Sequence, residues 1–152
     1  MEYNYRDHAG NTGDSVIRTI IITSFSCDDV DISTGECEAL VALYNSTDGR
    51  NRYNSGGWLQ STGVCGVRSG IICDGNGHIG RIDLSNNNLS GYIPVELNNL
   101  TALQSLILES NNISSIVDGA FSGMTELNLI NLKYNQLTSL PVSIFNLSLI
   151  HI

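Results

Sequence analysis

The sequence has few basic residues: 7 lysines and arginines stand against 15 aspartates and glutamates, which gives its 152 residues a formal net charge of −8. The basic residues form no stripe, and such a stripe is what binding to nucleic acid or to an anionic membrane surface requires. No apolar run approaches the roughly 20 residues of a membrane-spanning helix. We therefore expect no nucleic-acid partner and no membrane span in this chain.

The sequence also lacks the motifs of a metal site or a catalytic site. It has no C-x-x-C pair, and its histidines, His8, His78 and His151, do not have metal-ligand spacing. No histidine lies in a Ser/His/Asp or Cys/His arrangement, no glycine-rich loop follows a strand and opens a helix, and the acidic residues are scattered singly. We predict that the chain uses no metal or cofactor and is not an enzyme.

The dominant feature is one pattern that occurs three times. L-x-x-L-x-L-x-x-N-x-L, with isoleucine allowed for leucine, occupies residues 79–89, 103–113 and 127–137, a period of 24 residues. Such a period indicates a solenoid, in which each unit buries its apolar face by stacking on its neighbours. The alternating part of each unit predicts a short strand. An asparagine side chain both donates and accepts, so a stacked row can satisfy buried turn backbone. This row would be Asn87, Asn111 and Asn135.

These residues resemble the leucine-rich repeat family, whose anchor positions are met in all three units. The resemblance implies an α/β fold, a curved right-handed solenoid with a parallel sheet on its concave face. Residues 89–94, LSGYIP, are similar to the plant-specific subclass, in which a second short strand forms on the convex side. The second unit, with Ala120-Phe121, is instead similar to the repeats of animal extracellular proteins.

A cap is predicted before the repeats. Ser33 lies three residues before Glu36, the spacing of a capping box, and a helix follows that stops at Asp48-Gly49. Two short β-prone runs on either side of an Asn-Gly turn at residues 76–77 indicate a hairpin that feeds its last strand into the repeats.

This cap resembles the N-terminal region that precedes extracellular leucine-rich repeats of the plant and protist type. The resemblance has two departures. The family has a tryptophan shortly after the Asp-Gly turn, where this chain has Arg52 or Tyr53, and a second one between the paired cysteines, where this chain has Val67-Arg68. We expect these losses to weaken the cap, since burying an aromatic side chain contributes about 2 kcal/mol.

All four cysteines precede the repeats. We interpret Cys65 and Cys73 as a disulfide that closes a short loop, with two free buried thiols as the alternative. Cys27 and Cys37 could form a second bridge that pins the N-terminal extension to the start of the helix. These cysteines favour an extracellular or cell-surface location.

Five N-x-S/T sequons point to the same location. Four of them arise from the repeat consensus itself, so only the one at Asn45 is independent support. The candidate glycosylation sites are Asn45, Asn88, Asn99, Asn112 and Asn146.

The predicted organisation has three parts. Residues 1–32 form a polar, acidic extension that is either disordered or an edge strand. Within it, residues 16–25, VIRTIIITSF, make a plausible buried strand and a poor secretory signal, with a degenerate or mis-started signal as the alternative. Residues 33–78 form the cap, and residues 79–152 form three repeats and the start of a fourth at Ile150. The sequence shows no C-terminal cap, so we expect either a truncated product of a longer gene or a partner contact at the apolar last edge.

The solvent-facing strand positions of stacked repeats form one continuous concave surface, which is where such arrays bind. The predicted ligand-binding residues, unit by unit, are Arg81, Asp83, Ser85 and Asn86; Ser105, Ile107, Glu109 and Ser110; and Leu129, Asn131, Lys133 and Tyr134.

Their mixed polar and apolar character is typical of a protein or peptide contact. We predict a non-catalytic recognition module for a protein, a peptide or a glycan. Two alternatives implied by the family remain open: a truncated ectodomain of a receptor-like kinase, and an ice-binding or polygalacturonase-inhibitor-like repeat protein. A third reading is that this surface is a solvated strand face with no ligand.

Overall fold

The computed structural model describes residues 26–28, 30–54, 58, 63–66, 70–146 and 150–151. The candidate strand at residues 16–25 and the Val67-Arg68 pair lie outside the described residues. The elements in chain order are α1 (Thr34–Ser46), η1 (Gly49–Asn51), β1 (Ile71–Cys73), β2 (Ile79–Asp83), β3 (Ser90–Ile93), η3 (Val95–Asn99), β4 (Ser105–Ile107), β5 (Asn112–Ile116), β6 (Leu129–Asn131), η4 (Val142–Asn146) and β7 (Ile150–His151).

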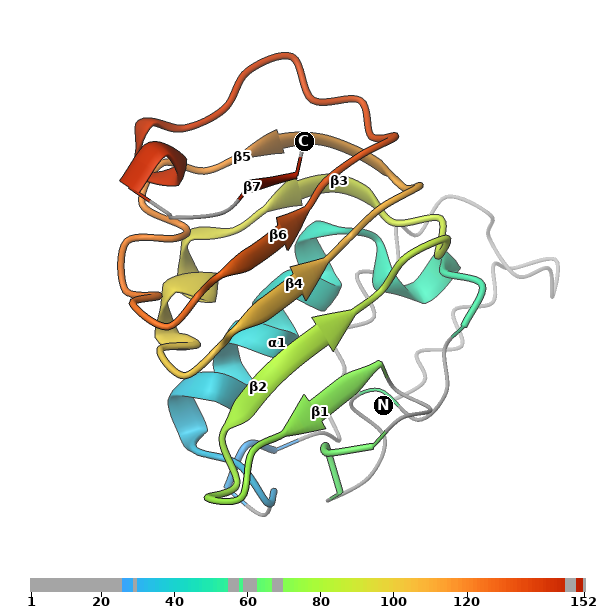
Figure 1. Cartoon of the computed structure of the whole chain (residues 1–152). Helices are drawn as coiled ribbons and strands as arrows, with labels where there is room; N and C mark the ends of the chain where they lie inside the picture. The colour runs from blue at the N-terminus through green and yellow to red at the C-terminus, as the bar shows by residue number, and fades with distance from the viewer. Residues whose placement is uncertain are drawn as a thin grey trace, which may run out of the picture.

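The repeats build a five-stranded sheet with the order β1-β2-β4-β6-β7 (Figure 1). Strands β2, β4, β6 and β7 are parallel, and only β1 is antiparallel to its neighbour. The 24-residue period sets the register, which aligns Ile82 with Leu106 and Leu106 with Ile130. All three side chains are fully buried, so one apolar row runs through the stack. The predicted hairpin is confirmed, because β1 pairs with β2 across the turn at residues 74–78.

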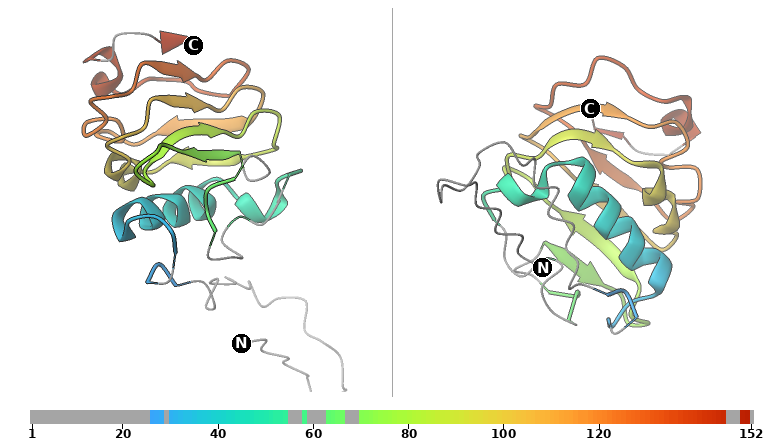
Figure 2. Two further views of the ribbon diagram at one scale, coloured as in Figure 1. Left: turned by 60° about the horizontal axis from the view of Figure 1, so that its bottom comes forward. Right: turned by 180° about the vertical axis from the view of Figure 1, so that it is seen from behind.

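A second, two-stranded parallel sheet forms from β3 and β5 on the other side of the stack (Figure 2). The sequence predicted a convex strand for the first repeat only, and the second repeat forms one as well. The reason is pairing: Asn112 N donates to Leu89 O at 2.7 Å and Val117 N to Ile93 O at 2.9 Å, so β5 copies the extended backbone of β3.

Helix α1 covers the first repeat at the N-terminal end of the stack (Figure 2). Its capping box is present, with the Ser33 side chain accepting from Glu36 N and the Glu36 side chain accepting from Ser33 N. The helix buries Ala39, Leu40 and Leu43 against η3 and β3. Gly91 permits the close approach, because a Cβ at this position would lie 2.2 Å from Ser46 O and its φ is +107°.

The repeat asparagines tie successive turns together. Asn111 Nδ2 donates to Leu84 O and to Leu108 O, each at 2.9 Å, while Asn111 Oδ1 accepts from Asn87 N at 3.1 Å and Leu89 N at 2.9 Å. The side chain is buried, so these four backbone groups have no access to water instead. One amide therefore satisfies backbone groups in two neighbouring units.

The row continues in both directions. Asn135 Nδ2 donates to Leu108 O at 2.8 Å and to Leu132 O at 3.1 Å, and Asn135 Oδ1 accepts from Ile113 N at 3.0 Å. At the other end, Asn87 Oδ1 accepts from Asn54 N at 2.7 Å. Since Asn54 belongs to the cap, the same type of bond that joins the repeats also docks the cap on the first repeat.

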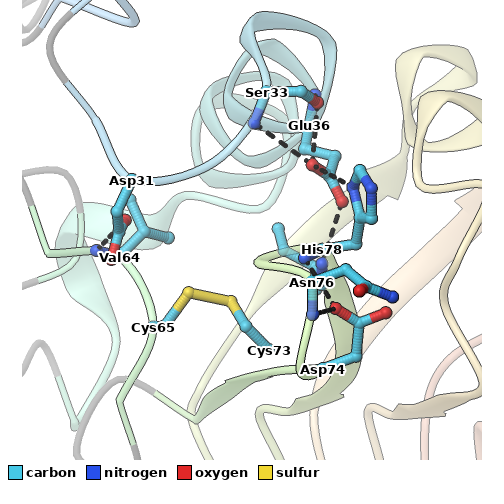
Figure 3. Close-up of a disulfide and its surroundings, with 10 residues drawn as sticks. Asp31, Ser33, Glu36, Val64, Cys65, Cys73, Asp74, Asn76 and His78 are labelled. Atoms are coloured by element: carbon cyan, nitrogen blue, oxygen red, sulfur yellow. Dashed lines mark hydrogen bonds and ion pairs between the residues drawn. A yellow bond between two sulfur atoms is a disulfide. The ribbon is translucent and has the colours of Figure 1, made fainter.

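Both predicted disulfides form, Cys27–Cys37 and Cys65–Cys73, with Cα atoms 5.6 Å and 5.5 Å apart. The first joins the chain before α1 to the first turn of that helix. The second joins residues 63–66 to β1 (Figure 3). The cap is therefore cross-linked at both of its ends.

The Glu36 carboxylate is the polar link between α1 and the first repeat (Figure 3). It accepts from Ser33 Oγ at 2.7 Å and Ile79 N at 2.8 Å, and His78 Nδ1 lies 3.3 Å away. Burial raises the pKa of Glu36, but the hydrogen bonds from Ser33, Ile79 and His78 outweigh burial, so the net pKa lies below 4.5.

We predict that Asn111→Leu lowers the free energy of unfolding by about 1 to 3 kcal/mol, because buried turn groups of two repeats lose their partners. A thermal or urea melt followed by circular dichroism measures the loss. The matched control is Asn112→Leu, the exposed next residue, which we expect to cost less. Equal melts for Asn111→Leu and the unsubstituted protein would refute the structural role of the row.

Glu36→Gln should lower stability at pH 7 by about 1.5 kcal/mol, since hydrogen bonds to a buried carboxylate are replaced by weaker ones. Because the folded-state pKa is depressed, the carboxylate stabilises fully above its usual value of 4.5, and this contribution disappears as the pH falls through the folded value. The gap between wild-type and variant melts should therefore close on acidification. Glu38→Gln, on the exposed side of the same helix, is the control, and a gap that persists at low pH would count against the linkage.

Candidate ligand-binding face

The outer side of β2, β4 and β6 presents two columns of side chains, which we call the concave face. One column is Arg81, Ser105 and Leu129, and the other is Asp83, Ile107 and Asn131. Register alone brings these residues together, because each column contains the same position of three consecutive repeats. The pairing of β2, β4 and β6, which lie side by side in Figure 1, therefore brings six of the predicted residues into adjacent positions.

The remaining predicted residues are not strand residues, which corrects the sequence-based placement. The strands end at Asp83, Ile107 and Asn131, so the positions two and three residues further on lie in the turns. The predicted residues that lie in turns and not in strands are Ser85, Asn86, Glu109, Ser110, Lys133 and Tyr134.

These turn residues still stack. Asn86 N donates to Glu109 O, and Ser110 N donates to Lys133 O, each at 2.9 Å. Asn86, Ser110 and Tyr134 adopt left-handed φ values of 52°, 56° and 56°, which turn the chain away from the sheet. Tyr134 is 77% exposed as a result.

Asp83 is bonded within its own repeat. Its carboxylate accepts from Arg81 Nη2 at 2.9 Å and from Ser85 Oγ at 2.8 Å. Burial raises the pKa of Asp83, but the bonds from Ser85 and the charge of Arg81 outweigh this and leave the pKa lowered. Asp83 is therefore ionised at neutral pH, and its charge is matched by Arg81.

Asn131 joins the second and third repeats. Its Nδ2 donates to Glu109 Oε2 at 2.7 Å, and its Oδ1 accepts from Lys133 N at 3.1 Å. Glu109 is thus held by Asn131, and Lys133 has no ion-pair partner among the described residues. Ser105 Oγ is buried and likewise has no hydrogen-bond partner within the described part of the chain.

The apolar residues of the concave face are less exposed than the sequence predicted. Ile107 and Leu129, expected to be exposed, are only partly buried, so each still offers some surface. Sequence reasoning missed Ile72, which is 44% exposed and pairs with Arg81, extending the first column onto β1. The signal was available, since Ile72 alternates with the buried Ile71 in the strand before the hairpin turn.

The candidate glycosylation sites that the structure describes all lie off the concave face. Asn45 is on α1 and Asn99 ends η3, both exposed, while Asn88 and Asn112 precede and begin convex strands. Asn112 Nδ2 donates to Asn88 Oδ1 at 3.3 Å. The Asn146 side chain lies outside the described residues, and glycosylation at all five positions stays a prediction.

Within the described ranges, no group of three histidine, cysteine or acidic residues could hold a metal ion. None of the helices described is long and apolar enough to cross a membrane.

Comparisons with known proteins agree with this geometry. Residues 101–152 and residues 78–100 each match the leucine-rich repeat family. The PEPR1–AtPEP1 crystal structure is similar in fold, with a TM-score of 0.63 and 21% identity over 76% of this chain, which spans only 17% of that chain. The leucine-rich repeat ectodomain of the receptor kinase SOBIR1 from Arabidopsis thaliana has a TM-score of 0.47 and 19% identity, covering 71% of each chain. No curated protein matches the sequence.

The family matches begin at residue 78, one residue before β2 and the first of the three sequence repeats. The similarity to PEPR1 covers more of the chain than the repeats occupy, so it reaches into the cap. The stacked strands and the buried asparagine row are what the matched repeats require. Residues 78–152 of this chain are leucine-rich repeats, and they form a leucine-rich repeat solenoid.

Proposed function

We propose that the chain is a non-catalytic recognition module that binds a protein or peptide on its concave face. The observation that carries the proposal is the way polar and apolar groups divide on that face. Asp83, Glu109 and Asn131 are bonded to neighbours within the protein. Satisfied polar groups are held in place before a ligand arrives, which lowers the cost of binding.

The groups that remain available belong to the second and third repeats. Leu129 follows Ser105 in one column, Ile107 precedes Asn131 in the other, and Lys133 and Tyr134 follow Asn131 along the chain. Aromatic residues are enriched at the centre of protein interfaces, whereas a charged residue such as Lys133 is typical of the polar rim. We therefore place the main contact on Ile107, Leu129, Lys133 and Tyr134.

The fold shared with PEPR1 supports the architecture alone, so the ligand class is argued from the face itself. A strand-lined surface with backbone groups already paired in the sheet leaves recognition to side chains. The two disulfides favour an oxidising compartment, and we propose an extracellular or cell-surface location for this module.

The test uses a displayed library of random peptides, selected on the wild-type protein. Ile107→Ser with Tyr134→Ser should weaken binding of the selected peptides at least tenfold, because a lost anchor typically costs more than 1 kcal/mol. The melt should change little, since Tyr134 lies in solvent and Ile107 is only partly buried.

The matched control is Tyr92→Ser with Val95→Ser, an aromatic and an aliphatic residue exposed on the convex side. Isothermal titration calorimetry on both double variants decides the outcome. Binding that survives the concave substitutions and is lost on the convex ones would move the site to the opposite face.

A further inference from the structure

Arg52 occupies a buried place in the cap. The family resemblance puts a tryptophan shortly after the Asp-Gly turn, where Arg52 or Tyr53 could stand. The structure decides between them: Arg52 is 5% exposed and Tyr53 is 79% exposed. A guanidinium therefore fills a position close to the core, directly after η1.

Two aromatic rings flank this guanidinium. Arg52 Cζ lies 4.3 Å from the centroid of the Trp58 ring and 5.8 Å from that of Tyr44, and the two rings are 5.8 Å apart. Stacking of this kind accounts for the faces of the planar group. The five N–H donors lie in the plane of the guanidinium, and each needs an acceptor at its edge.

Those donors have no acceptor among the residues that the structure describes. Arg52 Nε, Nη1 and Nη2 are all buried and make no hydrogen bond within the described part of the protein, and the same holds for the indole Nε1 of Trp58. The ion pairs among the described residues are His78–Glu36 and Arg81–Asp83, so no carboxylate compensates Arg52 there. The cluster consists of donors and one positive charge.

The charge is retained at neutral pH. Burial lowers the pKa of Arg52 to about 10, partly opposed by the charge interaction with Tyr44, and this value still leaves the group protonated. A buried cation without a partner is strongly unfavourable, and a bound anion is the simplest compensation for a group of donors.

We propose that Arg52 and Trp58 form a site for a small inorganic monoanion of the chloride class. The anion accepts from the guanidinium edge, with the Trp58 indole N–H as the neighbouring donor. Because the donor nitrogens have almost no accessible surface, the proposal commits to a small anion rather than to a phosphate ester or a carboxylate-bearing molecule. Binding includes a small movement around Arg52 that admits the ion.

The site lies where the cap meets the repeats. Tyr53 N and Asn54 N, the next two backbone groups, donate to Asn87 O at 3.3 Å and Asn87 Oδ1 at 2.7 Å. An anion that binds only when Arg52 is in place stabilises this docked arrangement. Chloride thus acts as a ligand that fastens the cap to the asparagine row.

Trp58 is the single tryptophan of the chain, so its fluorescence reports on this site directly. Iodide, which quenches indole emission, is titrated at constant ionic strength with gluconate as the balancing, bulky anion. We expect a saturable quenching phase in the wild type that chloride competes away. Arg52→Met should retain only linear collisional quenching, and Arg50→Met, which removes an exposed charge in η1, should behave as the wild type.

A melt in chloride and in gluconate gives an independent measurement. The wild-type melting temperature should rise with chloride at constant ionic strength, and that of Arg52→Met should not respond. If Arg52→Met does not fold, the wild-type comparison and Arg50→Met suffice. Linear quenching together with identical wild-type melts in the two salts would overturn the proposal.

Discussion

The buried amide of Asn111 is the interaction on which the stack depends. A solenoid unit of 24 residues must turn twice, and its turns leave backbone donors and acceptors in the interior. Asn111 satisfies four of them: the carbonyl groups of Leu84 and Leu108, and the N–H groups of Asn87 and Leu89. An apolar side chain could fill the same space but would leave these groups unpaired. The spacing of the units is therefore held by polar bonds, while apolar burial supplies the drive to stack.

The cap completes this arrangement because it imitates a repeat at its edge. Asn54 N donates a hydrogen bond to Asn87 Oδ1, just as Leu89 N donates one to Asn111 Oδ1. The Glu36 carboxylate adds a second polar link through Ile79 N at the start of β2. Helix α1 then covers the apolar row that the first repeat would otherwise expose. The cap is joined to the repeats by the same chemistry that joins the repeats to one another.

The sequence was sufficient for what the repeat period determines. The alignment of Ile82, Leu106 and Ile130 follows from the 24-residue spacing, and so do both columns of the concave face. It was insufficient where a partner in space decides. Strand β5 is extended because β3 lies beside it, and Ile72 joins the face because β1 pairs with Arg81. No local pattern of the second repeat indicates β5, since propensity in strands depends on neighbours, whereas the exposure of Ile72 was indicated by its alternation with Ile71.

Polar groups are paired on the concave face and unpaired at the candidate anion site in the cap. On the concave face, Asp83 is bonded within its own repeat and Asn131 is bonded to both the second and the third repeat, so the recognition that we propose falls to Ile107, Leu129 and the turn residues beyond them. At Arg52 the described part of the protein supplies donors without acceptors. Buried polar groups in native proteins are nearly always paired, so an unmatched buried charge calls for a partner. The contrast favours an ion from solution as part of the folded cap.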